Sequence, residues 1–159
     1  MRKEGDEIMK RIKGGIKVVM GQIDTGTYNG SKNKIQLFDG KFTTGYRIKE
    51  LRVSPKSPAG TGEFLFKVST EPKSNISEFN WDDVEEVGWA TVMVPLGYGN
   101  GEQSNIRNEN MAIQDLYISA YTTSGTTLQI NYELVLEKYE FTAWDGAAIM
   151  VRNQSQSGS

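Results

Sequence analysis

From Ile16 onward, apolar and polar residues alternate with a period of two, which is typical of strands that bury one face. The pattern is clearest from Thr127 to Phe141. There the apolar residues Leu128, Ile130, Tyr132, Leu134 and Leu136 alternate with Gln129, Asn131, Glu133, Val135 and Glu137. One face of this strand is therefore expected to lie in a core and the other in water, as in an antiparallel sheet.

Further strands are predicted between clusters of glycine, asparagine and proline. They cover Ile16–Asp24, Ile35–Phe38, Phe42–Val53, Glu63–Thr70, Glu86–Val94 and Asp115–Thr122. Within Phe42–Val53 the apolar positions change parity at Lys49–Glu50, which predicts a bulge or a change of sheet. Within Glu86–Val94, alternation places Val87 and Trp89 on the face toward the core.

Turn signals separate these strands. Asp-Gly at Asp39–Lys41 and "TSG" at Thr123–Gly125 each predict a hairpin, since such residues accept the φ values of tight turns. The segment "PLGYGNGEQSNIRNENM" is expected to be a long polar loop. Short strands at this spacing predict a single all-β domain over residues 16–142, an antiparallel β-sandwich of jelly-roll type.

The two ends of the chain differ from this pattern. Residues 1–15 form a charged stretch in which Ile8, Met9 and Ile12 fit a short helix, broken by Gly14–Gly15. We expect a flexible N-terminal arm. The alternative is an arm that docks on a neighbouring subunit, with Ile8, Met9, Arg11 and Ile12 as candidate assembly residues. Residues 143–159 are expected to form a turn or short helix and a polar tail.

Composition narrows the function. The 159 residues include no cysteine and no histidine, and the net charge is −2. This removes thiol nucleophiles, the usual serine triad and most zinc sites, and it indicates a protein that is not an enzyme and binds no cofactor. There is no signal-peptide pattern and no apolar run that could span a membrane, so no membrane partner is expected. Nucleic acid is disfavoured, since acidic residues accompany the basic ones in the arm.

The stretch "NWDDVEEVGWA" at residues 80–90 holds four carboxylates between Trp81 and Trp89. Its main interpretation is an exposed acidic turn that enters a strand, with Trp89 in the core. Its acids lack the spacing of an EF-hand, although a looser calcium site stays open. A carboxylate-only glycosidase would need a second acid from elsewhere, for which Asp24, Asp39 and Asp145 are conceivable.

Carbohydrate binding is the alternative function. Tyr28, Trp81, Tyr98, Tyr121 and Trp144 lie near predicted loops or outward strand positions, where aromatic rings can stack on a sugar. The candidate surface for a glycan or another partner comprises Trp81, Asp82, Asp83, Tyr98 and Trp144. The loop Gly97–Asn105 lacks the lysine and helix of a phosphate loop, so it is interpreted as a flexible loop, of the kind in which recognition often resides.

Two blocks, "KIQLFDGKFTTGYRIKELRVSPKSP" and "LQINYELVLEKYEFTAWDGAAIMVRNQSQ", resemble small β-rich virion proteins of bacteriophages over roughly residues 33–156. The resemblance implies a capsid-associated, decoration or minor virion component, located in the virion and assembled in the host cytoplasm. Its partners would be other virion or capsid subunits, and it would act as a homo-oligomer. The resemblance supplies no catalytic position.

Overall fold

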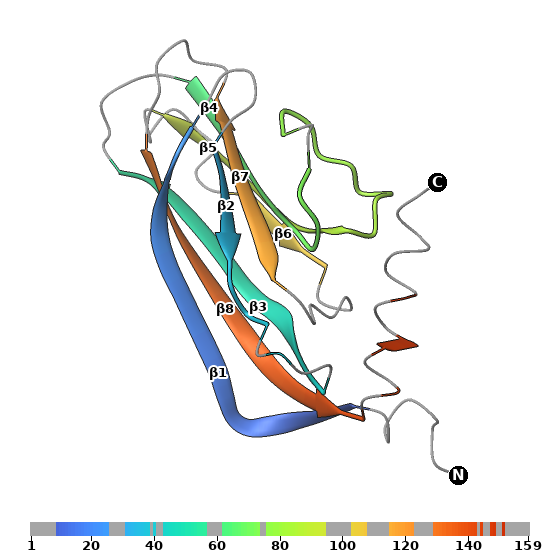
Figure 1. Cartoon of the computed structure of the whole chain (residues 1–159). Coiled ribbons are helices and arrows are strands. Elements are labelled where there is room, and N and C mark those ends of the chain that lie inside the picture. The colour runs from blue at the N-terminus through green and yellow to red at the C-terminus, as the bar shows by residue number, and fades with distance from the viewer. Residues whose placement is uncertain are drawn as a thin grey trace.

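The computed structural model describes residues 9–25, 31–38, 40, 43–56, 62–73, 76–94, 103–107, 115–122, 129–142, 144, 147, 148 and 151. These residues contain eight strands: β1 (Met9–Asp24), β2 (Ser31–Ile35), β3 (Thr44–Pro55), β4 (Gly62–Ser69), β5 (Glu86–Val94), β6 (Gln103–Ile106), β7 (Leu116–Thr122) and β8 (Gln129–Phe141). They form two antiparallel sheets that pack face to face (Figure 1). The all-β sandwich predicted from the alternation is therefore confirmed.

Strand order in the two sheets is β1-β8-β3 and β2-β7-β4-β5-β6. The first strand pairs with the last, the second with the seventh, and the fourth with the fifth. This nested pairing is that of a long double ribbon rolled into two sheets, the jelly-roll topology. The short strand β6 pairs with β5 and also contacts β3, which brings the open edges of the two sheets together.

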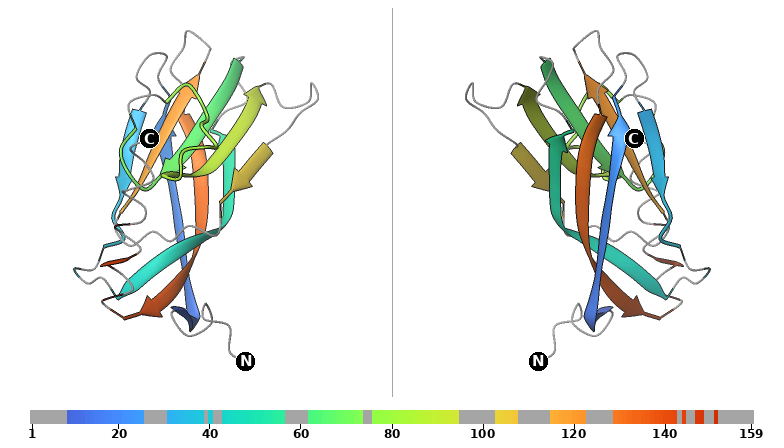
Figure 2. Two further views of the ribbon diagram at one scale, coloured as in Figure 1. Left: turned by 90° about the vertical axis from the view of Figure 1, so that its right-hand side faces the viewer. Right: turned by 90° about the vertical axis from the view of Figure 1, so that its left-hand side faces the viewer.

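The core lies between the sheets and is lined by alternate residues of each strand. Phe64, Phe66 and Val68 of β4 and Ile130, Leu134 and Leu136 of β8 are each at most 1% exposed. The long strands β1, β3 and β8 continue past the five-stranded sheet at one end of the molecule (Figure 2). Burying these side chains is the main stabilising contribution, since each full burial contributes roughly 1.5–3 kcal/mol.

A tyrosine and a glycine lie opposite each other on neighbouring strands. Gly21 of β1 pairs with Tyr132 of β8, and a Cβ atom on Gly21 would meet the Tyr132 Oη at 2.5 Å. On the other side the Tyr132 ring stacks on Phe66 of the facing sheet, with centroids 5.5 Å apart. The absent side chain at position 21 thus makes room for the ring that joins the two sheets.

Two bulges set which residues face inward. The parity change at Lys49–Glu50 is confirmed as a register shift in β3 between Ile48 and Glu50. A second shift, between Val68 and Ser69 of β4, was not predicted; it places Gly88 opposite Val68 and leaves Val87 as the extra residue. Trp89 therefore lies beside Lys67, on the face away from the space between the sheets. It is buried as predicted, with 5% of its surface exposed, but it does not share a face with Val87.

Both predicted hairpins are wrong. Gly40 has the expected positive φ of 87°, but the strands on either side of it belong to different sheets. β7 and β8, on either side of the "TSG" sequence, also belong to different sheets. A turn signal marks a reversal of the chain, whereas the partner of each strand is chosen by contacts distant in the sequence.

Three local predictions also need correction. The strand predicted at Ile35–Phe38 is β2 at Ser31–Ile35, and the predicted polar loop contains β6. The predicted helix is wrong from Met9 onward, because β1 begins there and Met9–Arg11 pair with Tyr139–Phe141. The pairing shifts between Arg11 and Ile16, so Gly14–Gly15 lie in an irregular part of a strand and do not end a helix.

The ends of the chain are described only in part. Residues 1–8 lie outside the described residues, so the N-terminal arm stays a prediction there. At the other end Trp144, Ala147, Ala148 and Val151 are helical, which favours the short helix over the turn. Within the described part of the chain, no helix combines the length and the apolar character that a membrane crossing needs.

Candidate functional site

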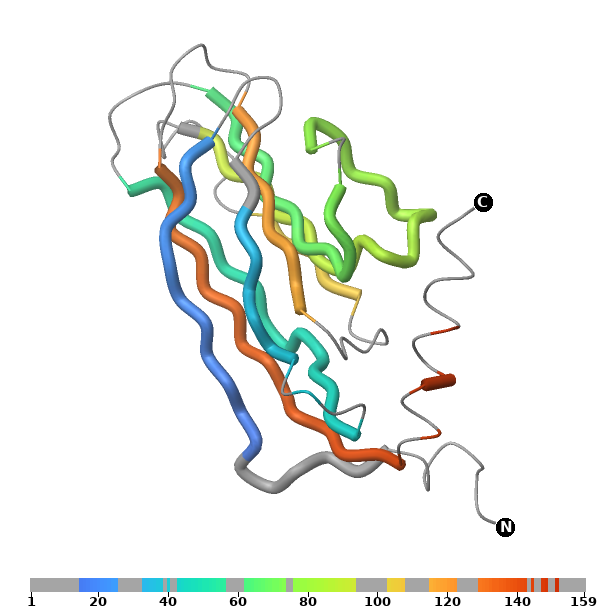
Figure 3. Tube along the Cα trace, viewed as in Figure 1, coloured from blue at the N-terminus to red at the C-terminus, as the bar shows by residue number. Residues whose placement is uncertain are grey.

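The segment between β4 and β5 folds back over the outer face of the five-stranded sheet (Figure 3). Thr70 N–H donates to the Glu85 carbonyl (2.8 Å), which closes the ends of the loop. Two successive turns follow, in which Asp83 N–H donates to the Asn80 carbonyl and Glu86 N–H to the Asp83 carbonyl. Asp83 Oδ1 also accepts the Glu85 N–H at 3.0 Å, a local bond that aspartate commonly makes in turns.

Under this loop lies a buried ion pair. Lys67 Nζ is 3.3 Å from Glu86 Oε2, and both side chains are 1% exposed. Lys67 Nζ also donates to the Glu78 carbonyl at 3.0 Å. Burial lowers the pKa of Lys67 below its ordinary value, and the neighbouring Glu86 offsets only part of that effect.

Glu86 accepts hydrogen bonds on both carboxylate oxygens. Oε1 accepts the Trp89 Nε1–H and the Asn80 N–H, each at 2.9 Å. Oε2 accepts from Lys67 Nζ and from Asn80 Nδ2, the latter at 3.1 Å. Two of these donors belong to Asn80 in the loop, and the others belong to Lys67 and Trp89 in the sheet, so Glu86 links the loop to the sheet. A buried polar group needs such hydrogen bonds to offset the loss of water.

A second ion-pair group lies nearer the surface. Lys73 Nζ is 2.7 Å from Asp83 Oδ2 and 2.5 Å from Glu85 Oε2. Although burial acts in the opposite direction, these two hydrogen bonds raise the pKa of Lys73 above its ordinary value. Burial likewise opposes the effect at Asp83, where the hydrogen bond from Lys73 lowers the pKa of the carboxyl. Asp83 and Glu85 are thus both paired with Lys73.

The two tryptophans of the motif lie together. Trp81 is 61% exposed and packs on Trp89 with ring centroids 5.8 Å apart. Arg107, directly after β6, lies over the other tryptophan, with its Cζ 5.4 Å from the Trp89 ring centroid. The guanidinium also donates to the carbonyls of Trp81 and Asp83. Trp81 therefore covers Trp89 and still presents much of its ring to solvent.

The structure brings together three of the predicted surface residues, Trp81, Asp82 and Asp83, in one turn. Trp144 is 82% exposed near the C-terminus, and Tyr98 lies outside the described residues. Of the assembly residues, Met9, Arg11 and Ile12 lie in β1, and Ile8 is outside the described part. In the described ranges no three acidic side chains are grouped so that they could hold a metal ion, so the open calcium alternative finds no ligand set there.

Sequence reasoning missed the buried Lys67–Glu86 pair and the partly buried Asn80 that bonds to it. Alternation placed Lys67 on the outer face of β4, where a lysine normally reaches solvent. The signal that could have found them is the sixteen-residue connection after that strand, Thr70–Glu85, which is long enough to fold back over its outer face.

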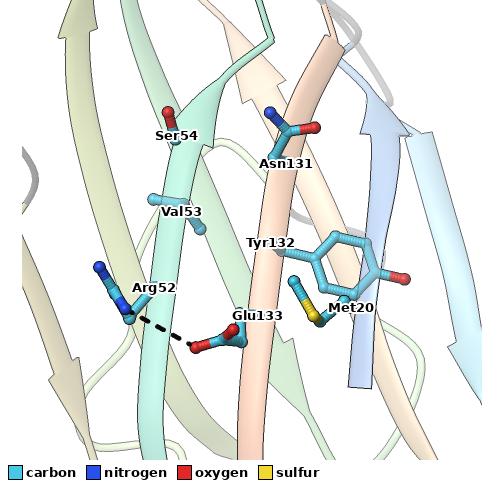
Figure 4. Close-up of a pocket in the computed structure, with 7 residues that line it drawn as sticks. All are labelled: Met20, Arg52, Val53, Ser54, Asn131, Tyr132 and Glu133. Carbon is cyan, nitrogen blue, oxygen red and sulfur yellow. Dashed lines mark ion pairs between the residues drawn. The ribbon is translucent and has the colours of Figure 1, made fainter. Parts of the chain in front are cut away.

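A second surface lies on the outer face of the three-stranded sheet. Ile16, Val18 and Met20 alternate along β1 and are 43%, 51% and 71% exposed. Next to Met20 is a hollow of about 190 Å³, shown in Figure 4, whose lining includes Tyr132 and the Arg52–Glu133 ion pair at 3.9 Å. Within the described ranges β1 pairs with β8 alone, so β1 forms the edge of its sheet.

No protein family model matches the chain, and no curated protein matches it. Among solved structures the chain is similar to the Merkel cell polyomavirus VP1 unassembled pentamer. Sequence identity is 8%, the TM-score is 0.46, and the match covers 84% of this chain and 99% of that chain. A likeness at this level carries no argument, so the fold assignment rests on the strand order described above.

Proposed function

We propose that this chain is a non-enzymatic virion structural protein that works by assembling with copies of itself and with other virion subunits. It would serve as a capsid-associated, decoration or minor component of a bacteriophage particle, as the resemblance in its sequence implies. The observation that carries the assembly part of this proposal is the apolar face of the edge strand β1. Three alternate residues there, Ile16, Val18 and Met20, are more than 40% exposed.

An edge strand offers unpaired backbone groups to another strand, and most proteins cover or charge such edges. Here the centre of the strand is instead apolar on its outer face. Exposed apolar patches on soluble proteins commonly mark interaction sites. Adding a strand at this edge would satisfy the backbone groups and cover the apolar side chains in one step.

The occupant that fits this edge is a second copy of the chain. In an antiparallel pair centred on Val18, Ile16 of one copy would lie opposite Met20 of the other, so the contact is self-complementary about a two-fold axis. The distribution of charge along β1 also favours an antiparallel pair of copies. Lys10, Arg11 and Lys13 lie toward its N-terminal end and Asp24 lies at its C-terminal end. Antiparallel pairing sets the basic end of one copy near the acidic end of the other.

Substituting Val18→Lys tests this interface. A two-fold contact carries the substitution twice at its centre, so we expect self-association to weaken at least about 100-fold. Light scattering across a concentration series should show an oligomer for the native chain and a monomer for the variant. Gln22→Lys is the matched control, because Gln22 lies on the same exposed face beyond the apolar residues; it should assemble normally.

Truncation before residue 9 tests the arm without removing β1. If assembly needs the arm, the shortened chain should dissociate, and electron micrographs of the full chain should show closed oligomers or ordered arrays. A native chain that stays monomeric at high concentration would count against self-assembly through β1.

The second candidate function is carbohydrate binding, favoured by the exposed ring of Trp81 supported by Trp89. A sugar could stack on Trp81 while the exposed Asp82 accepts hydrogen bonds from its hydroxyls. On a glycan array, binding that is lost in Trp81→Ala and retained in Trp144→Ala would support this function. Equal binding by both variants would exclude Trp81 as the platform.

A further inference from the structure

Lys67, Asn80 and Glu86, under the β4–β5 loop, have the chemical groups that an amide cross-link requires. Lys67 Nζ and Asn80 Nδ2 both donate to one oxygen, Glu86 Oε2, at 3.3 and 3.1 Å. The lysine amine and the asparagine amide therefore meet at a single carboxylate. The lysine comes from the middle of β4, the asparagine from the loop, and the glutamate from the start of β5.

Each of these three groups has a chemical role in forming an amide. A neutral amine is a nucleophile, a side-chain amide carbon is an electrophile, and a carboxylate beside both can carry a proton from one nitrogen to the other. Water competes poorly for a lysine that is 1% exposed beside a glutamate that is also 1% exposed. Because Lys67 and Asn80 are both held on one oxygen of Glu86, a reaction between them would be intramolecular, which removes much of the entropic barrier.

We propose that Lys67 and Asn80 join in an intramolecular isopeptide bond, with Glu86 as the catalytic residue that transfers the proton. The bond would form after folding, since only the folded chain brings the three residues together. It would tie the middle of β4 to the loop that covers the outer face of the sheet.

The reaction needs no other reagent. The Lys67 ammonium first loses one proton, through Glu86, to solvent. The Nζ lone pair then attacks Cγ of Asn80, and the C=O π electrons move to Oδ1. Glu86 Oε2 takes a proton from Nζ and gives it to Nδ2, to which it is already hydrogen-bonded. The Cγ–Nδ2 bond then breaks, the C=O bond re-forms, and ammonia leaves. The products are one secondary amide and one ammonia molecule, with no change in oxidation state.

The surroundings support the required state of the amine. Desolvation favours neutral Lys67 by lowering the pKa of its amine. Two of the donors on Glu86, the Trp89 Nε1–H and the Asn80 backbone N–H, hold its Oε1 in place and leave Oε2 for the reaction. The Asn80 side chain is held on the same oxygen before any reaction takes place.

Mass spectrometry of the purified full-length chain tests the proposal. The intact mass should be lower than that of the sequence by one ammonia molecule, after incubation at neutral pH if the bond forms slowly. Trypsin should then fail to cut after Lys67. The product would be a branched peptide that joins residues 57–73 to residues 74–107, because the tryptic sites around Lys67 are Lys56, Lys73 and Arg107.

Two results would overturn it. One is an intact mass equal to that of the sequence. The other is a loss of ammonia with normal cleavage after Lys67, which is the signature of a succinimide at one of the asparagines. Asn80→Ala and Glu86→Gln should both restore the full mass, whereas Asn33→Ala, at an exposed position of β2, should keep the branched peptide. None of these readouts depends on self-association, so this inference and the proposed function can fail separately.

Discussion

Glu86→Gln is expected to lower the free energy of unfolding by roughly 3–5 kcal/mol, the cost of removing one partner from a buried ion pair. Glutamine keeps the size of the side chain but offers one acceptor oxygen in place of two. Four donors now share the carboxylate, including Lys67 Nζ and Trp89 Nε1. The variant would leave a buried lysine without a counter-charge and at least one buried donor without an acceptor. Urea unfolding followed by circular dichroism measures the loss.

Glu133→Gln is the matched control for this substitution. Glu133 is likewise in an ion pair, with Arg52, but the two charged atoms are 3.9 Å apart. The Arg52 side chain is 71% exposed and the Glu133 side chain is 27% exposed. An ion pair of this kind contributes about 0–1 kcal/mol, so the control should unfold almost as the native chain does. Similar losses in both variants would show that burial of the Lys67–Glu86 pair has little energetic importance.

Asn80→Ala separates the ion pair from the proposed cross-link. It keeps Glu86 and Lys67 but removes the amide that the cross-link needs. If Glu86→Gln and Asn80→Ala destabilise equally, the cross-link accounts for the whole effect. If Glu86→Gln is the more damaging, the carboxylate itself holds the loop.

Asp115→Ala is expected to lower the free energy of unfolding by about 3 kcal/mol, since hydrogen bonds to a charged group contribute roughly 1.5–3 kcal/mol each. Asp115 lies directly before β7, and its Oδ1 accepts the N–H groups of Leu37 and Phe38 at 2.9 and 3.1 Å. These groups belong to the chain as it leaves β2 to cross between the sheets. Alanine would leave both without this acceptor. Asp115→Asn, which keeps an acceptor oxygen, should lose clearly less.

The Asp115 carboxyl should also make the free energy of unfolding depend on pH. Burial acts to raise the pKa of Asp115, but the bonds from Phe38, Lys34 and Leu37 outweigh it and lower the pKa below its ordinary value. The unfolded chain therefore binds a proton more readily than the folded chain. Stability from this group is complete well above pH 4 and is lost as the pH falls through the lowered pKa.

Urea titrations at pH 7 and at pH 3 check this dependence. The native chain should be less stable at pH 3 than at pH 7. Asp115→Asn should show a smaller loss of stability, because asparagine has no carboxyl group to protonate. An equal loss in both chains would assign the acid sensitivity to other carboxyls, of which Asp83 also has a lowered pKa.

The strands were predictable because their information is local. Alternation identified seven of the eight strands in the described part of the chain, and the parity change in β3 identified its bulge. Two bounds were less accurate, since β1 begins at Met9 instead of Ile16 and β2 shares only Ile35 with its predicted range. Side chains on one face of a strand report burial directly, so Ile130, Leu134 and Leu136 could be assigned to the core without coordinates. The absence of histidine and cysteine limited the chemistry in the same direct way.

Pairing and the polar cluster depend on contacts between residues far apart in the chain. The sequences around Gly40 and at "TSG" have the residues of hairpin turns, yet in each case the strands before and after lie in different sheets. Lys67 and Glu86 look like surface residues, because alternation cannot show that a loop folds over the outer face of a strand. Composition and periodicity therefore determined the fold class and most of the core, whereas the strand order and the Lys67–Asn80–Glu86 group follow from long-range packing that no local pattern encodes.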